Sequence, residues 1–264
     1  MFFDTHAHLA DPALLPLWEE SPSLLERAWS ASVRTILNIS IDLASWERAQ
    51  LWREKYADRI FHAAAVHPSH VREDVKENFF SKVSQAAEQG ELVAIGETGM
   101  DRGEHSPSLA WQELSFRRHI HLARAHSLPL IVHCRNAYED IRRILENEDK
   151  RGTVRGVLHC FTGNRQEAQF FLDRGWFLSL SGILTFGNAE KLRETVRSLP
   201  LRSLLLETDA PYLSPHPYRK EKLNRPDRVV EVARVLAELY QISLEEVARQ
   251  TTENGRSLFA LPRC

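Results

Sequence analysis

The chain has 264 residues, of which 43% are hydrophobic and 27% are charged, and its formal net charge is −2 at pH 7. This composition is typical of an ordinary globular protein, and the charge argues against a strongly basic nucleic-acid-binding protein. No apolar run is long enough to span a bilayer, and the N-terminus lacks the basic and apolar regions of a secretory signal. Three cysteines without CxxC spacing, Cys134, Cys160 and Cys264, fit a reducing compartment. We therefore expect a cytoplasmic protein with no membrane partner.

Eight apolar stretches predict the strands of a parallel sheet. The first is the opening segment Met1–His8. The other seven are rich in Val, Ile and Leu, and they are Val33–Ile41, Ile60–Val66, Leu92–Gly96, Leu128–His133, Val154–His159, Trp176–Ser181 and Ser203–Glu207. Continuous apolar runs of this kind are typical of a parallel sheet whose outer face is covered by helices.

Amphipathic, charged segments alternate with these strands and predict helices. They are Ser21–Ser32, Leu43–Tyr56, Val75–Gln89, Leu109–Ser127, Ala137–Asn147, Arg165–Arg174, Ala189–Ser198, Pro226–Tyr240 and two closing helices, Ser243–Arg249 and Thr252–Leu258. Eight β/α units in this length predict a closed (β/α)8 TIM barrel that forms a single domain over residues 1–264. An open doubly wound sheet is the alternative, but no GxGxxG fingerprint follows the first strand. Two long polar connections, Met100–Ser108 and Pro211–Arg225, are expected to wall a substrate cleft.

The first strand ends in two histidines. Because side chains in a strand alternate between faces, His6 and His8 point to the same face and can hold one metal ion together. Taken alone, such a pair is also compatible with ordinary packing.

Polar residues at the ends of four later strands favour metal binding by this pair over ordinary packing. Glu97, His133, His159 and Asp209 each stand at or just past the carboxyl end of an apolar run. In a barrel these ends meet at one rim, which is where active sites lie. The resulting set of four histidines, one glutamate and one aspartate exceeds what one tetrahedral ion needs, and it lacks the thiolates of a closed structural zinc site.

A hydrolytic centre with two divalent metal ions is the economical interpretation. The two oxygens of Glu97 can bridge both ions, and Asp209 can hold one of them and accept the proton of the nucleophile, so both residues are assigned catalytic roles. Water or hydroxide on the metals is the expected nucleophile, because a divalent metal lowers the pKa of bound water from about 16 toward about 7. Histidine-rich ligation suits zinc, manganese or cobalt, and the carboxylates also accept magnesium.

Other polar residues near the rim are candidates for supporting roles. His67, which follows the third strand, is expected to contact substrate rather than metal. Asp101 either accepts a hydrogen bond from a ligand histidine or caps its loop, and Glu207 lies a layer deeper than Asp209 as a hydrogen-bonding support.

Candidate phosphate contacts are Arg135 and a basic cluster after the eighth strand. The cluster comprises Arg219, Lys220, Lys222, Arg225 and Arg228. It is read either as a phosphate-binding surface or as an ordinary solvated loop. Three aromatic residues could stack on a base or pack in the core, and they are Phe161, Tyr212 and Tyr218.

Seven motifs in order along the chain carry a family resemblance: DTHAHL, AVHP, GETGMD, IVHCRNA, LHCFTG, ETDAPYL and TTENGRSLF. Over essentially its full length the chain resembles the TatD family of metal-dependent deoxyribonucleases, within the amidohydrolase-like barrels. The resemblance implies six metal ligands, His6, His8, Glu97, His133, His159 and Asp209, and it implies that Glu97 bridges two ions.

The chain departs from the family pattern at three places. Met100 replaces the usual leucine, and the segment Arg102–His105 lacks the tyrosines often found there. The segment Leu223–Pro226 stands where the family typically reads RNEP, so that Asn224 is kept as a candidate substrate contact. These departures spare the proposed ligands but affect the expected substrate preference.

The leading hypothesis from the sequence is a metal-dependent deoxyribonuclease that hydrolyses phosphodiester bonds exonucleolytically, at single strands or ends, as the resemblance implies. A hydrolase of another ester or amide, such as an aminoacyl or phosphoester substrate, is the alternative. A catalytically inactive barrel serving as a binding module is disfavoured by the intact ligand set. No obligate protein partner is evident from the sequence.

Overall fold

Eight parallel strands form the centre of the computed structural model, which describes residues 1–71 and 77–262. They are β1 (Phe2–Ala7), β2 (Val33–Ser40), β3 (Ile60–Ala64), β4 (Ala94–Asp101), β5 (Leu130–Arg135), β6 (Gly156–Leu158), β7 (Phe177–Leu180) and β8 (Leu204–Leu206), each paired with the next. The last strand returns to the first, since the N–H of Asp209 donates to the carbonyl of His6 at 2.9 Å and that of His8 to Ala210 at 2.7 Å. The predicted (β/α)8 barrel is confirmed.

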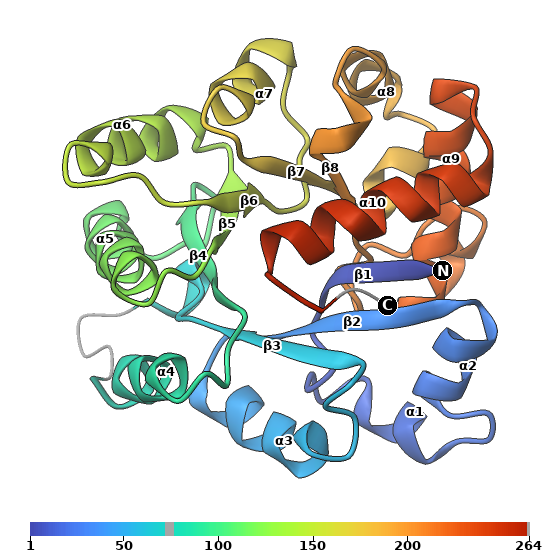
Figure 1. Ribbon diagram of the computed structural model, residues 1–264, viewed down its shortest axis with the longest axis horizontal. Helices are drawn as coiled ribbons and strands as arrows, with labels where there is room; N and C mark the ends of the chain where they lie inside the picture. The colour runs from blue at the N-terminus through green and yellow to red at the C-terminus, as the bar shows by residue number, and fades with distance from the viewer. Residues whose placement is uncertain (72–76, 263–264) are drawn as a thin grey trace.

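Helices cover the outside of the barrel, as Figure 1 shows. The α-helices are α1 (Leu15–Glu19), α2 (Leu24–Ser30), α3 (Leu43–Arg53), α4 (Glu77–Glu88), α5 (Leu109–Ala125), α6 (Tyr138–Asp149), α7 (Arg165–Leu172), α8 (Glu190–Arg197), α9 (Val229–Tyr240) and α10 (Leu244–Leu258). Short 3-10 helices are η1 (Pro68–His70), η2 (Gly182–Thr185), η3 (Leu201–Ser203), η4 (Tyr218–Lys220) and η5 (Pro226–Arg228). None of the helices in the described part of the chain is both long and apolar enough to cross a membrane.

Several helices begin at side chains that satisfy the free N–H groups of the first turn. Asn164 accepts hydrogen bonds from two backbone N–H groups of α7, and the Glu167 carboxylate returns a bond to the Asn164 N–H at 2.7 Å. The same reciprocal arrangement starts α2 at Ser23 and α3 at Asp42. These caps explain why the helices start close to the predicted residues.

The C-terminal helix closes the end of the barrel opposite the ligand-bearing strand ends. Leu258, Phe259 and Leu261 pack with Phe3 and other residues that point into the barrel. In Figure 1, α10 runs across the end of the barrel next to β1. A Cβ at Gly255 would lie 2.7 Å from the Phe3 ring, so glycine is required for α10 to approach β1 this closely. With this end blocked, the carboxyl ends of the strands form the open mouth.

The structure differs from the predicted elements in several respects. The two predicted closing helices are one helix, α10, in which the hydroxyl of Thr251 bonds to the carbonyl of Val247 at 2.8 Å. The short helix α1 was not predicted. The strand β4 continues to Asp101, so Glu97 lies within a strand rather than after one. The first residues of the predicted helix Val75–Gln89 lie outside the described residues, and α4 begins at Glu77.

Candidate metal centre and active site

The six predicted metal ligands meet at the open mouth of the barrel. They are His6 on β1, Glu97 on β4 and His133 on β5, together with His8, His159 and Asp209, which follow β1, β6 and β8. Within the described residues three groups have metal-ligand spacing: the first is His6, His8 and Glu97, the second is His67, Glu97 and His133, and the third is His6, His159 and Glu207. Glu97 belongs to the first two groups.

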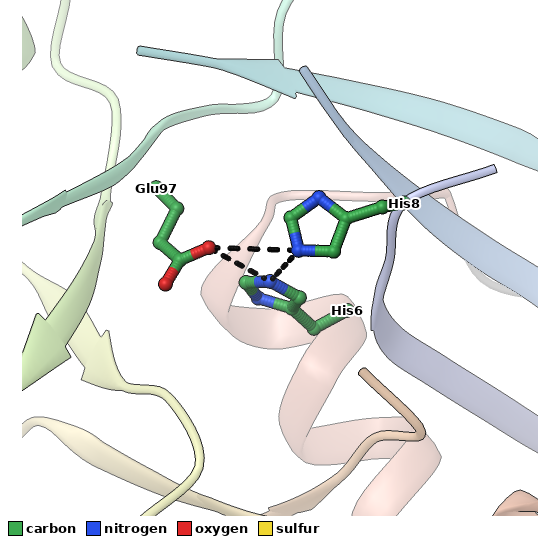
Figure 2. A group of neighbouring side chains, drawn as sticks. All are labelled: His6, His8 and Glu97. Carbon is green, nitrogen blue, oxygen red and sulfur yellow. Dashed lines mark hydrogen bonds and ion pairs between the residues drawn. The ribbon is translucent and has the colours of Figure 1, made fainter. Parts of the chain in front are cut away.

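The first group gathers two nitrogens and two carboxylate oxygens. Nε2 of His6 and Nε2 of His8 lie 3.3 Å apart, and each faces Oε2 of Glu97, at 3.3 and 3.6 Å (Figure 2). Oδ1 of Asp209 lies 3.6 Å from His6 and 3.4 Å from His8. Nδ1 of His8 faces the carbonyl of Ile39 at 3.3 Å, so a proton on Nδ1 leaves Nε2 free to bind a metal.

The second group surrounds the other oxygen of Glu97. Oε1 lies 2.7 Å from Nδ1 of His133, 3.0 Å from Nε2 of His159 and 3.2 Å from Nε2 of His67. The two oxygens of one carboxylate therefore face two separate sets of histidines. This geometry fits a carboxylate that bridges two cations.

Two further carboxylates, Asp101 and Glu207, orient two of these histidines. Nε2 of His133 lies 2.9 Å from Oδ2 of Asp101, and Nδ1 of His159 lies 3.0 Å from Oε1 of Glu207. An ionised carboxylate only accepts hydrogen bonds, so the ring proton points toward Asp101 or Glu207 and the other ring nitrogen faces the site. Such an arrangement is typical of metal-binding histidines.

In His67 the ring nitrogen that faces away from the site accepts a hydrogen bond, whereas in His133 and His159 it donates one. Its Nδ1 accepts the backbone N–H of Ser69 at 3.1 Å, so in the neutral ring the proton resides on Nε2. Nε2 then donates toward Glu97 instead of offering a lone pair to a metal. This arrangement supports the prediction that His67 contacts substrate rather than metal.

The electrostatics of the cluster suit a cation. Burial alone would raise the pKa of the Glu97 carboxyl, but the facing rings of His159 and His67 hold that pKa well below its usual range. Asp209 also keeps a lowered pKa despite burial. Burial opposes a charge on His159, yet Glu97 and Glu207 raise its pKa well above the usual value. The ionised carboxylates thus favour a positive charge beside them, which a proton on His159 supplies. A bound cation can supply the same positive charge in place of that proton.

The backbone beside two of the ligands adopts a conformation that non-glycine residues rarely take. Cys160, next to His159, has φ of 48°, and Asp209 has φ of 57°. Hydrogen bonds hold both residues there, since the N–H of Cys160 donates to Glu207 at 2.7 Å and the N–H of Asp209 donates to His6. Local strain maintained by surrounding contacts is typical of functional sites.

Comparison with known proteins identifies a family and several relatives that resemble this chain. A family model described as TatD related DNase matches residues 3–260. YabD of Bacillus subtilis (strain 168), named an uncharacterized metal-dependent hydrolase, is 38% identical over 262 residues, which cover 99% of this chain and 100% of YabD.

The chain belongs to the TatD family. YcfH of Escherichia coli (strain K12), also named an uncharacterized metal-dependent hydrolase, is 37% identical over 257 residues, covering 97% of this chain and 94% of YcfH. The crystal structure of YjjV, a TatD homologue from E. coli K12, superposes with a TM-score of 0.88 at 31% identity, covering 99% of this chain and 98% of that one.

A buried acidic residue, Asp4, joins the first strand of this TatD-family barrel to the segment after the last strand, and it was not assigned a role from the sequence. Its oxygens accept the N–H of Thr208 at 2.9 Å and the Thr208 hydroxyl at 2.6 Å, and the N–H of His6 lies 3.4 Å away. An acidic residue inside a wholly buried strand must find hydrogen-bond partners, and this is the signal in the sequence that could have identified it.

Asn224 lies beside this link between Asp4 and Thr208, and its buried position corrects its predicted substrate contact. The residue is fully buried, and its amide donates to the carbonyl of Thr208 at 2.8 Å and accepts the N–H of Arg225 at 2.9 Å. Both ends of the amide are therefore occupied by backbone groups. Asn224 fixes the segment that carries Asp209 and does not face the mouth.

The candidate phosphate contacts differ in their surroundings. Arg135 ends β5 beside the mouth and is exposed. Arg219 is also exposed, but its guanidinium lies 3.7 Å from the centre of the Phe186 ring and bonds to the carbonyl of Ser214. Arg228 is buried and pairs with Glu221, so it does not extend the basic surface.

Proposed function

We propose that this chain is a metal-dependent hydrolase that cleaves the phosphodiester bonds of DNA, at ends or in single strands. The observation that carries the proposal is the placement of Glu97, whose two oxygens face two sets of histidines at the open mouth of the barrel. The match to a family model described as TatD related DNase, and the names of relatives such as YabD, also support it.

In this proposal the donor set would hold two divalent cations. His6, His8 and Asp209 would hold one, His133 and His159 the other, and Glu97 would bridge them. Nitrogen and carboxylate donors of this kind suit zinc, manganese, cobalt or magnesium. When bound, such cations lower the pKa of a water molecule and offset the charge that develops on a phosphoryl oxygen.

Three side chains at the mouth have roles in the proposed reaction. Asp209 is more exposed than Glu97, at 14% against 3%, so it is the better placed carboxylate to accept the proton of an attacking water. The Nε2 proton of His67 points into the site and can donate to a phosphoryl oxygen. Arg135, on the rim, can hold a neighbouring phosphate.

A nuclease assay across metals tests this proposal. Protein stripped with EDTA and reloaded with Mn²⁺, Mg²⁺, Zn²⁺ or Co²⁺ is given single- and double-stranded oligonucleotides labelled at either end. We expect metal-dependent release of nucleotides, and metal analysis near two ions per chain. Glu97→Gln and Asp209→Asn variants that remain folded should lose the activity, whereas Glu194→Gln, an exposed residue of α8, should retain it. Hydrolysis of a small ester or aminoacyl substrate without hydrolysis of DNA would instead favour the alternative activity.

A further inference from the structure

The mouth of the barrel carries an exposed aromatic ring beside the metal ligands. Of the three aromatic residues that the sequence offers for stacking, Phe161 is buried in the core, and the Tyr218 ring lies under the guanidinium of Arg228, 4.5 Å from its centre. Tyr212 is 51% exposed. Its face is therefore open to a ligand.

Tyr212 is placed directly next to the first group of metal ligands. Its N–H donates to the carbonyl of Asp209 at 2.8 Å, which closes a tight turn after β8. Its ring lies edge-on to the His8 ring, with 5.9 Å between ring centres. The ring thus stands at the side of the donor group.

The ring is held in place from a second segment of the chain. The Tyr212 hydroxyl donates to Oδ2 of Asp11 at 2.9 Å, and Oδ1 of Asp11 accepts the N–H of Ala13 at 2.8 Å. Asp11 belongs to the segment after β1, and Tyr212 to the segment after β8. An exposed aromatic side chain that is anchored at its tip loses little freedom when a ligand stacks on it, so it is a suitable platform for binding.

We propose that Tyr212 forms the wall of a base subsite and stacks on the nucleobase of the nucleotide that carries the scissile phosphate. This inference rests on the proposed function and deepens it. In a nucleotide the sugar separates the base from the phosphate, so a base belongs beside the metal ligands and not among them, which is where Tyr212 stands. Stacking tolerates every base, because each has an aromatic face.

The subsite also specifies the form of the nucleic acid. An internal base of a duplex has both faces covered by its neighbours, whereas a terminal or single-stranded base has a free face, so the ring selects ends or single strands. We therefore expect recognition of a terminal or single-stranded base without preference for its identity.

The test combines a change in the protein with a change in the substrate. Single-stranded oligonucleotides with a normal terminal nucleotide are compared with oligonucleotides whose terminal nucleotide is abasic, at each end in turn. We expect the wild-type kcat/KM to fall about 5- to 150-fold on removal of the base at the cleaved end. In Tyr212→Ala the ratio of kcat/KM for the normal substrate to kcat/KM for the abasic substrate should fall toward one. In Tyr212→Phe, which keeps the ring, this ratio should stay at the wild-type value. Leu51→Ala, an exposed apolar residue on α3, is the control and should keep the wild-type ratio.

Two results would overturn the inference. If Tyr212→Ala lowers cleavage of both substrates equally, the residue only supports the site. If Tyr212→Phe loses as much as Tyr212→Ala on both substrates, the hydroxyl and not the ring matters. Should the wild type cleave neither substrate, the proposed function fails, and equilibrium binding of the same oligonucleotides by fluorescence anisotropy decides on Tyr212 independently. Base-dependent binding that Tyr212→Ala abolishes supports the subsite, and base-independent binding contradicts it.

Discussion

At the scale of single residues, the histidines of the mouth differ in whether the protonated ring nitrogen faces away from the site, as in His133 and His159, or toward it, as in His67. Carboxylates accept the outer ring protons of His133 and His159, whereas a backbone N–H approaches the outer nitrogen of His67. The same type of side chain is therefore arranged to offer a lone pair to a metal ion in one place and to donate a hydrogen bond in another. The partner on the far side of the ring determines the chemistry.

Replacing Asp101 by asparagine tests this role of the outer partner. Asp101 accepts the Nε2 proton of His133 and also the Gly103 N–H and the Ser106 hydroxyl, each at 2.6 Å. In Asp101→Asn the negative charge that makes His133 a better ligand is lost, so we expect metal affinity to fall about 10- to 100-fold. Competition with a metal buffer of known affinity measures it. Ser106→Ala removes one bond to Asp101 but keeps the carboxylate, so equal losses in both variants would show that loop structure is responsible.

At the scale of elements, the sequence predicts where ligands stand but not how long the strands are. The four late ligands were located because each follows an apolar run, and this rule depends only on the parallel arrangement. The extension of β4 to Asp101 was missed because Gly96, Gly99 and the acidic residues between and after them are typical of a loop. In the structure, Gly99 pairs with His133 and Asp101 with Arg135 on β5. That pairing is a tertiary interaction, which local sequence does not encode.

A buried histidine of α5 shows the same limit, because no pattern in the sequence pointed to it. His119 is fully enclosed, with Nδ1 donating to the carbonyl of Ser115 at 2.8 Å and Nε2 accepting the N–H of Val66 at 3.3 Å. It thereby joins α5 to the residue that precedes His67. Both bonds require a neutral ring with its proton on Nδ1.

This histidine should make the stability of the protein depend on pH. Burial lowers the pKa of His119 to about 4, against a model-peptide value of 6.5. Between these values the unfolded chain binds the proton and the folded chain does not, so the stability is full above pH 6.5 and is lost as the pH falls toward 4. At pH 5 the loss from this group is about 2 kcal/mol. The free energy of unfolding, measured with urea in EDTA, should therefore decrease between pH 7.5 and pH 5 in the wild type. In His119→Gln this decrease should be about 2 kcal/mol smaller. Parallel pH dependence in the two proteins would contradict the assignment.

At the scale of the whole molecule, the metal site depends on the closure of the barrel. The first group of ligands combines β1 with the segment after β8, which lie some two hundred residues apart in the chain but pair through His6, Asp209 and Ala210. The hydrogen bonds between Asp4 and Thr208 hold this seam together. If the seam opened, His6 and Asp209 would separate and the first metal position would be lost.

Removing the hydrogen bonds between Asp4 and Thr208 should therefore weaken the fold and the site together. In Asp4→Ala the buried N–H and hydroxyl of Thr208 lose their acceptor, and we expect the free energy of unfolding in EDTA to fall by about 2 to 4 kcal/mol. Metal affinity of the folded variant should fall as well, because His6 and Asp209 are no longer fixed relative to each other. Asp4→Asn, which keeps one acceptor, should lie between Asp4→Ala and the wild type in both measurements.

Thr252 provides the matched control for this experiment. Its hydroxyl donates to the carbonyl of Met1 at 3.1 Å, so it also joins the start of the chain to its end, but on the exposed surface at the opposite end of the barrel. Because water replaces this bond, Thr252→Ala should change neither the unfolding free energy nor the metal affinity appreciably. A loss of stability in Asp4→Ala with unchanged metal affinity would mean that the seam can loosen without moving His6 and Asp209 apart, and the link between barrel closure and metal binding would then be wrong.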